Sequence, residues 1–201
     1  MTCADCGGEL AAGELFCPAC GALQPPDPTV DHFARLGLER RFEQDPEQVT
    51  AAHRALQRKL HPDRFVSRGE AARAHSLRHA TALNDAVRIL RDPVDRADYL
   101  LSLHGRDIAA EEGTLRLDPA FLMEVFELRE AIGELAGKDA HVERGRIERD
   151  IAGRYEEKLL ALGQGLDDPG ERTTADLDRL AQLAAQLRYL KNILRELHAV
   201  E

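Results

Sequence analysis

Apolar residues recur every three or four positions over most of the chain after residue 29, a spacing typical of amphipathic α-helices. Over residues 46–60 the regular apolar positions are Val49, Ala52, Leu56 and Leu60. Over residues 69–90 the long apolar side chains expected on the inner face are Leu77, Leu83, Val87 and Leu90. This pattern predicts two helices that are joined by a short loop.

Residues that favour helix ends support these boundaries. Asp31 is a suitable N-cap for a short helix over 31–38. Asp45 and Pro46 provide an N-cap and a first helical residue for the next helix. That helix must end near His61, because Pro62 disfavours the α conformation of the residue before it.

Three more amphipathic stripes follow residue 118. The first contains Phe121, Val125, Leu128, Ile132 and Leu135. The second contains Ile147, Ile151, Tyr155, Leu159 and Leu162. The last, over 174–198, contains Leu180, Leu183, Leu187, Leu190, Leu194 and Leu197. Short connections between three such helices predict an antiparallel bundle, so the fold class is all-α, with a helical hairpin followed by a three-helix bundle.

Several side chains of the bundle lie off these stripes. At 100° per residue, three large apolar residues point roughly 100° to 200° away from the line through Phe121, with two acids beside them. A tyrosine on the last helix lies roughly 130° from the centre of its seam. Exposed apolar groups of this kind usually mark a partner, and packing within the chain is the other interpretation. We call this set the bundle patch: Leu122, Met123, Phe126, Glu127, Glu130 and Tyr189.

The chain's four cysteines form two C-x2-C pairs separated by ten residues: Cys3, Cys6, Cys17 and Cys20. This spacing indicates a metal site, because each pair can present two thiolates of a tetrahedral centre. A glycine follows each pair, where a knuckle turns into positive φ. The site is closed by protein ligands and therefore structural, with zinc expected and iron as the alternative. No export signal is visible, which argues against disulfides.

A metal-knuckle module of the zinc-ribbon kind is therefore expected over residues 1–24. It is too short to bury a core, so metal binding and folding should be one event, and metal removal should unfold residues 1–24 alone. Pro25, Pro26 and Pro28 disfavour helix and predict a short, stiff linker over 25–28.

Charge narrows the classes of function. The chain has 27 bases and 36 acids, a net charge of -9, and no Trp, which argues against nonspecific nucleic-acid binding. No apolar run reaches the ~18–20 residues of a membrane span. Residues 53–78 nevertheless hold seven bases and two acids. This basic segment can steer an acidic partner, although a solvated helix face is the alternative.

The turn His61-Pro62-Asp63, between a basic helix and a longer helix, resembles the J-domain of DnaJ-type co-chaperones, whereas a plain helix-stop turn is the alternative. Together with residues 97–105 and 121–130, the chain from 29 to 201 resembles the HscB family. The four-Cys module resembles that of the eukaryotic members and some bacterial ones. The chain has no Gly/Phe-rich linker and no further Cys-rich repeat, both of which general DnaJ-type chaperones usually have.

The resemblance implies a J-domain over 29–104 and a C-terminal bundle over 105–201 that binds an IscU-type iron–sulfur scaffold. It implies a co-chaperone and not an enzyme: the chain would stimulate the ATPase of a DnaK-class, HscA-like chaperone and promote iron–sulfur cluster assembly and transfer. The implied chaperone-binding residues are His61, Pro62, Asp63, Arg54, Arg58, Lys59 and Arg64. The implied scaffold-binding residues are those of the bundle patch.

Two other functions stay open: a general J-domain co-chaperone with another client, and a zinc-ribbon adaptor for nucleic acid or transcription. Self-association through the metal module also stays open. Because no targeting sequence is visible, we expect the cytoplasm of a bacterium, with a mature mitochondrial chain as the alternative.

Overall fold

The computed structural model describes residues 2–108, 117–135 and 140–199. The described residues form seven α-helices and one 3-10 helix, with no β-strand beyond two isolated bridges. The predicted all-α class is therefore confirmed. Contacts divide the chain into two compact units, Met1–Asp92 and Pro93–Glu201. None of the described helices is both long and apolar enough to cross a membrane.

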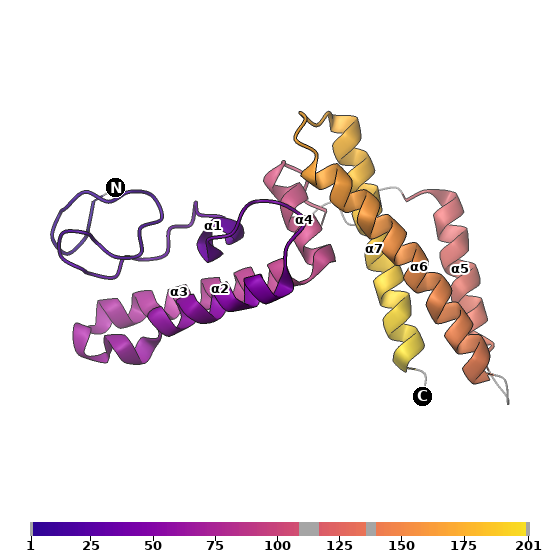
Figure 1. Cartoon of the computed structure of the whole chain (residues 1–201), viewed down its shortest axis with the longest axis horizontal. Coiled ribbons are helices and arrows are strands. Elements are labelled where there is room, and N and C mark those ends of the chain that lie inside the picture. The colour runs from indigo at the N-terminus through magenta and orange to yellow at the C-terminus, as the bar shows by residue number, and fades with distance from the viewer. Residues whose placement is uncertain (1, 109–116, 136–139, 200–201) are drawn as a thin grey trace. The chain divides into compact units, whose positions relative to one another are not determined.

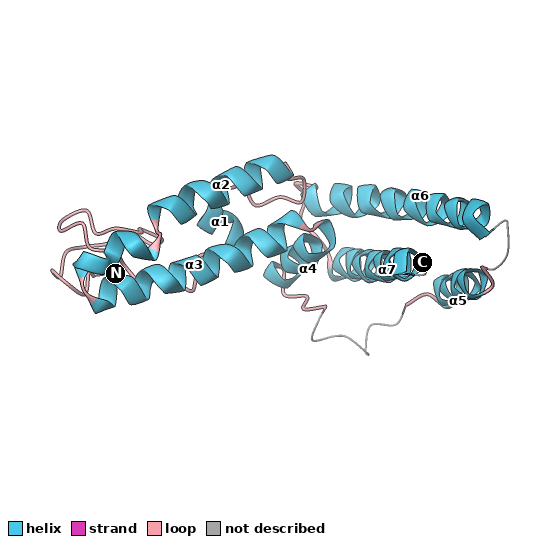
Figure 2. Cartoon of the chain, turned by 90° about the horizontal axis from the view of Figure 1, so that it is seen from below, coloured by secondary structure: helices cyan, strands magenta, loops and turns pink. Residues whose placement is uncertain are grey.

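The first unit contains a helical hairpin. Its elements are α1 (His32–Leu36), α2 (Pro46–Lys59), the 3-10 helix η1 (Pro62–Arg68) and α3 (Glu70–Arg91). Helices α2 and α3 lie side by side, and α1 packs against both (Figure 2). The predicted N-caps are confirmed: the side chain of Asp31 accepts from the backbone N–H of Ala34 at 2.8 Å, and that of Asp45 accepts from Glu47 at 2.8 Å.

The inner face of α3 differs from the predicted one. Leu77 is 51% exposed, whereas Ser76 and His79 are buried. The hydroxyl of Ser76 donates to the carbonyl of Leu60 at 2.6 Å, at the C-terminal cap of α2. Buried polar groups are tolerated when they are hydrogen-bonded. Ser76 and His79 can therefore face inward on α3, where the apolar pattern predicted Leu77.

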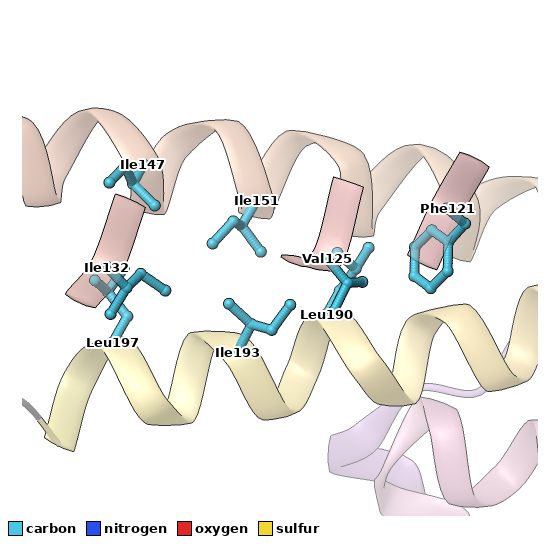
Figure 3. Close-up of a cluster of buried hydrophobic side chains, with 8 residues drawn as sticks. All are labelled: Phe121, Val125, Ile132, Ile147, Ile151, Leu190, Ile193 and Leu197. Carbon is cyan, nitrogen blue, oxygen red and sulfur yellow. The ribbon is translucent and has the colours of Figure 1, made fainter. Parts of the chain in front are cut away.

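The second unit is a helical bundle with one additional helix. Its elements are α4 (Pro93–Leu103), α5 (Pro119–Gly133), α6 (Ala140–Asp167) and α7 (Thr174–Ala199). Helices α5, α6 and α7 contact one another (Figure 1), as the three stripes predicted. Their inward side chains form one core cluster (Figure 3): Phe121, Val125, Ile132, Ile147, Ile151, Leu190, Ile193 and Leu197.

Helix α4 belongs to the second unit by its contacts. It packs against α6 and α7 and buries Val94, Ala97, Leu100 and Leu101. The division by contacts at residue 92 therefore differs from the sequence-based division at residue 104, because the apolar face of α4 is covered by bundle helices.

Truncation in this core should destabilise the second unit. Ile193 is fully buried and Leu160 on α6 is 64% exposed. We expect Ile193→Ala to lower the free energy of unfolding by about 2–5 kcal/mol, because a buried side chain is lost and a cavity is left. The matched change Leu160→Ala should stay within about 0.5 kcal/mol of the wild type. Urea unfolding followed by circular dichroism measures both, and equal losses would contradict the assigned core.

Candidate functional site

The N-terminal segment folds into two similar knuckles. In the first, the backbone N–H of Gly7 donates to the carbonyl of Cys3 at 2.9 Å. In the second, Gly21 donates to Cys17 at 2.8 Å. Gly7 and Gly21 have φ angles of 71° and 72°, a region that other residues adopt only with strain. The predicted role of these two glycines is therefore confirmed.

The sulfur atoms of the four cysteines converge. All four lie within 4.8 Å of one another, with 3.7 Å between the Sγ atoms of Cys3 and Cys20 and 3.6 Å between those of Cys6 and Cys17. Four thiolates placed ~2.3 Å from one metal ion in a tetrahedron are about 3.8 Å apart, so the spacing fits such an ion. It is far longer than the ~2.0 Å of a disulfide bond, and all four cysteines are free.

Hydrogen bonding in the knuckles acts differently on the cysteine thiols. Contacts among the sulfur atoms and burial raise the pKa of Cys6 above its usual value and that of Cys20 to about 12. The backbone N–H of Gly8 donates to Cys6 Sγ at 3.4 Å. A hydrogen bond from the backbone of Cys6 lowers the pKa of the Cys3 thiol to about 6. Because the thiolate is the form that ligates metal, Cys3 is the most readily deprotonated ligand. The convergence of all four sulfur atoms is what suits the cysteines to hold a metal ion in a closed site.

The module is attached to α3 through its last residues. His75 donates to the carbonyl of Leu23 and His79 to that of Gln24, both at 2.9 Å. Burial lowers the pKa of His79 below its usual value, so its ring is neutral at pH 7 and donates through Nε2. The buried amide of Gln24 also donates to the sulfur of Cys3 at 3.4 Å. One glutamine therefore links a candidate metal ligand to the helical hairpin.

This attachment differs from the predicted spacer. The residue before the proline segment is buried and hydrogen-bonded. After it, the guanidinium of Arg35 donates to the carbonyls of Asp27 and Val30, both at 2.9 Å. The segment 25–28 is thus held at both ends within the first unit, so loss of the module's fold would also affect α3.

The His-Pro-Asp turn begins η1 and is open to solvent. Nδ1 of His61 accepts from the backbone N–H of Asp63 at 3.3 Å, and Pro62 is the first residue of η1. The Asp63 side chain is 87% exposed, so its carboxylate is available to a partner. The remaining predicted chaperone-binding residues are also exposed: Arg54, Arg58 and Lys59 on α2, and Arg64 on η1.

Two aromatic residues that the sequence analysis did not consider lie beside this turn. Phe65 of η1 is 2% exposed, and its ring stacks on Phe16 of the second knuckle with 6.4 Å between centroids and 18° between planes. Phe16 directly precedes Cys17. A lone Phe beside a ligand cysteine was the available signal, but nothing in the linear sequence pairs it with Phe65.

The bundle patch is exposed, as predicted. Leu122, Met123 and Phe126 are 44%, 59% and 57% exposed, and Glu127 and Glu130 are exposed beside them. Tyr189 is 38% exposed, and its ring meets the edge of Phe121 at 6.3 Å and 81°. Because Phe121 directly precedes Leu122, this contact brings Tyr189 of α7 next to the start of the α5 surface.

Comparison with known proteins gives consistent matches. Residues 117–198 match the family model of the HSCB C-terminal oligomerisation domain. The chain is 32% identical over 194 residues to the iron-sulfur cluster co-chaperone protein HscB of Homo sapiens, covering 95% of this chain and 78% of that protein. It is 35% identical over 160 residues to the co-chaperone protein HscB homolog of Vibrio atlanticus, covering 79% of this chain and 93% of that protein.

Solved structures agree with the sequence matches. The crystal structure of human co-chaperone protein HscB aligns with a TM-score of 0.84 and 30% identity, over 99% of this chain and 98% of that one. Chaperone HscB from Vibrio cholerae aligns with a TM-score of 0.74 and 29% identity, over 85% of this chain and 97% of that one.

Removal of an ion bound by the four cysteines should affect more than the module. We expect removal of the ion by a chelator to speed amide hydrogen exchange in residues 1–24. Exchange around His75 and His79 should also become about tenfold faster, because the carbonyl groups that accept their hydrogen bonds are displaced. A tenfold change corresponds to about 1.4 kcal/mol. Exchange in the second unit should not change. The control is the same chelator presaturated with zinc. Acceleration confined to residues 1–24 would show that the contacts with α3 contribute no stability.

Proposed function

The chain belongs to the HscB family, and from this premise we propose that it binds an IscU-type iron–sulfur scaffold and presents it to a DnaK-class, HscA-like chaperone whose ATPase it stimulates. The relatives are named co-chaperones, and the chain would promote cluster assembly and transfer while the partner hydrolyses the ATP. The observation that carries the proposal is the presence of two exposed surfaces on separate units: the His-Pro-Asp turn and the bundle patch.

On the first unit, Asp63 is the centre of the proposed chaperone contact. Its exposed carboxylate can accept paired hydrogen bonds from an arginine of the chaperone, while Pro62 restricts the direction of the turn. The neighbouring cations are Arg54, Arg58, Lys59 and Arg64. Such charges attract an acidic surface and mainly raise the association rate.

On the second unit, the bundle patch has the composition of an interface centre. Leu122, Met123 and Phe126 offer apolar anchors, and Glu127 and Glu130 offer a polar rim. Tyr189 adds an aromatic anchor from α7. A scaffold with an apolar, basic-rimmed surface would complement this patch. This specificity for one scaffold is what separates the proposal from a general J-domain co-chaperone.

We propose zinc as the ion held by Cys3, Cys6, Cys17 and Cys20, since a closed four-thiolate tetrahedron is typical of structural zinc. Metal analysis distinguishes it from iron, which the same ligands also suit. The bacterial relatives favour the cytoplasm of a bacterium as the compartment. The metal site fits a zinc-ribbon adaptor as well, but the net charge of -9 disfavours nucleic acid as its partner.

Replacing Asp63 should separate folding from chaperone stimulation. We expect Asp63→Asn to weaken the affinity for the chaperone about 10- to 150-fold, because a charged hydrogen bond contributes about 1.5–3 kcal/mol. Stimulation of the ATPase should then be lost at protein concentrations that suffice for the wild type. Steady-state ATP hydrolysis by the purified chaperone measures this. The matched control is Asp85→Asn, at an exposed position of α3. An Asp63→Asn protein as active as the wild type would refute the assignment.

The bundle patch should be required for the scaffold alone. We expect the combined change Leu122→Ala, Phe126→Ala and Tyr189→Ala to weaken scaffold binding at least about tenfold, because anchor residues dominate interfaces, while chaperone stimulation persists. Co-purification from cell extract followed by calorimetry with the scaffold measures this.

The matched control truncates two exposed residues of α6, Val142→Ala and Leu160→Ala, which are 70% and 64% exposed. Unchanged scaffold binding by the triple variant would remove the bundle patch from the proposal. Failure of the wild type to bind any iron–sulfur scaffold would contradict the iron–sulfur role. The J-domain assignment would then be tested separately by the ATPase measurement.

A further inference from the structure

A groove lies where the second knuckle meets η1. It has a volume of about 400 Å³, and its lining combines both metal-module and hairpin residues: Phe16, Lys59, Arg64, Phe65 and Arg68. The half-buried ring of Phe16 supplies its aromatic surface and stacks on the buried ring of Phe65. The groove therefore exists only while the metal module is folded against η1.

The charged residues that line the groove are all of one sign. Nζ of Lys59 lies 5.3 Å from the Phe16 centroid, and the guanidinium carbon of Arg68 lies 5.7 Å from the Phe65 centroid. Arg64 is the third cation, and among the described residues that line the groove there is no carboxylate. Three cations in one lining attract an anionic segment.

The same geometry favours a peptide over a nucleic acid. Phe65 is almost fully buried and one face of the Phe16 ring lies against it, so the groove offers little free ring surface on which bases could stack. The whole chain has a net charge of -9, which repels a long polyanion more strongly than a short acidic segment. A short acidic segment with one apolar side chain can pair with the three cations and also pack against the apolar surface of the groove.

The groove is also continuous with the proposed chaperone contact. Lys59 and Arg64 belong to both, and Arg64 directly follows Asp63. A chaperone that binds the His-Pro-Asp turn therefore places its neighbouring surface over the groove.

We propose that the metal module, through Phe16, completes a second chaperone-binding groove beside the His-Pro-Asp turn. Its occupant is an acidic segment of the DnaK-class chaperone that inserts an apolar side chain between the cations. The inference rests on the proposed function and extends it, because it makes the four-Cys module part of the chaperone-facing surface.

The test compares two changes within the groove with one outside it. The probe is the purified DnaK-class chaperone in the presence of ATP, and the readouts are its affinity and the salt dependence of that affinity. We expect Phe16→Ala and Arg68→Glu each to weaken binding at least about tenfold. Arg68→Glu should also flatten the dependence on salt, because it removes a charge contact with the chaperone. The control Leu77→Ala truncates a side chain that is 51% exposed on α3 and outside the lining, and it should bind like the wild type.

Folding of the module is checked separately. Metal content and thiol accessibility are measured for each variant, and Phe16→Leu keeps an apolar side chain at the same position. We expect Phe16→Leu to retain the metal and to bind more tightly than Phe16→Ala. Arg68→Glu lies outside the module, so its effect does not depend on the module's stability.

The outcomes separate the inference from the proposed function. Wild-type affinity in both Phe16→Ala and Arg68→Glu, together with lost affinity in Asp63→Asn, overturns the groove and leaves the proposed function intact. No binding by the wild-type protein overturns both. Displacement of the chaperone by a single-stranded oligonucleotide at equal concentration assigns the groove to nucleic acid and also overturns the inference.

Discussion

A buried hydrogen bond from His79 of α3 to the carbonyl of Gln24 is the contact on which the architecture of the first unit depends. The first 24 residues contain too little apolar surface to fold alone, and a metal ion constrains only the chain near its ligands. Gln24 connects the metal site to the hairpin, because its side-chain amide donates to the sulfur of Cys3 while its backbone carbonyl accepts from His79 of α3. The order of the metal module and that of the hairpin are consequently linked.

This link determines what surrounds the His-Pro-Asp turn. A turn at the end of two helices is usually a solvated loop, yet Phe65 within η1 is almost fully buried. The ring that covers it, Phe16, comes from the metal module. The turn thus keeps an exposed carboxylate at Asp63 while its apolar side chain is packed. A turn anchored by a packed side chain loses less conformational entropy when a partner binds than an unanchored loop would.

The second unit meets a different constraint. Helix α5 has apolar residues on two sides, and only one side can face α6 and α7. Phe121, Val125 and Ile132 occupy the core, and Leu122, Met123 and Phe126 remain in contact with water. Burial of these side chains against a partner would be favourable by roughly 25 cal/mol per Å² of apolar area removed from water. The two surfaces that we assign to partners therefore lie on different compact units. The surface on the first unit relies mainly on charge, and that on the second unit relies mainly on apolar contact.

Local sequence determined much of this protein. Helix periods, the N-caps Asp31 and Asp45 and the turn glycines Gly7 and Gly21 depend on residues a few positions apart, and they are found where the sequence predicted them. The convergence of the four cysteines and the exposure of the bundle patch follow equally from local geometry, because knuckle spacing and helical rotation fix where those side chains point. Tertiary structure alone decided that Ser76 and His79 face inward while Leu77 faces solvent, that α4 packs with the bundle, and that Phe16 covers Phe65. These features rest on contacts between segments that are distant in the sequence, such as the hydrogen bond between Gln24 and His79, which are 55 positions apart. The periodicity of one segment carries no information about the surface on which that segment will pack.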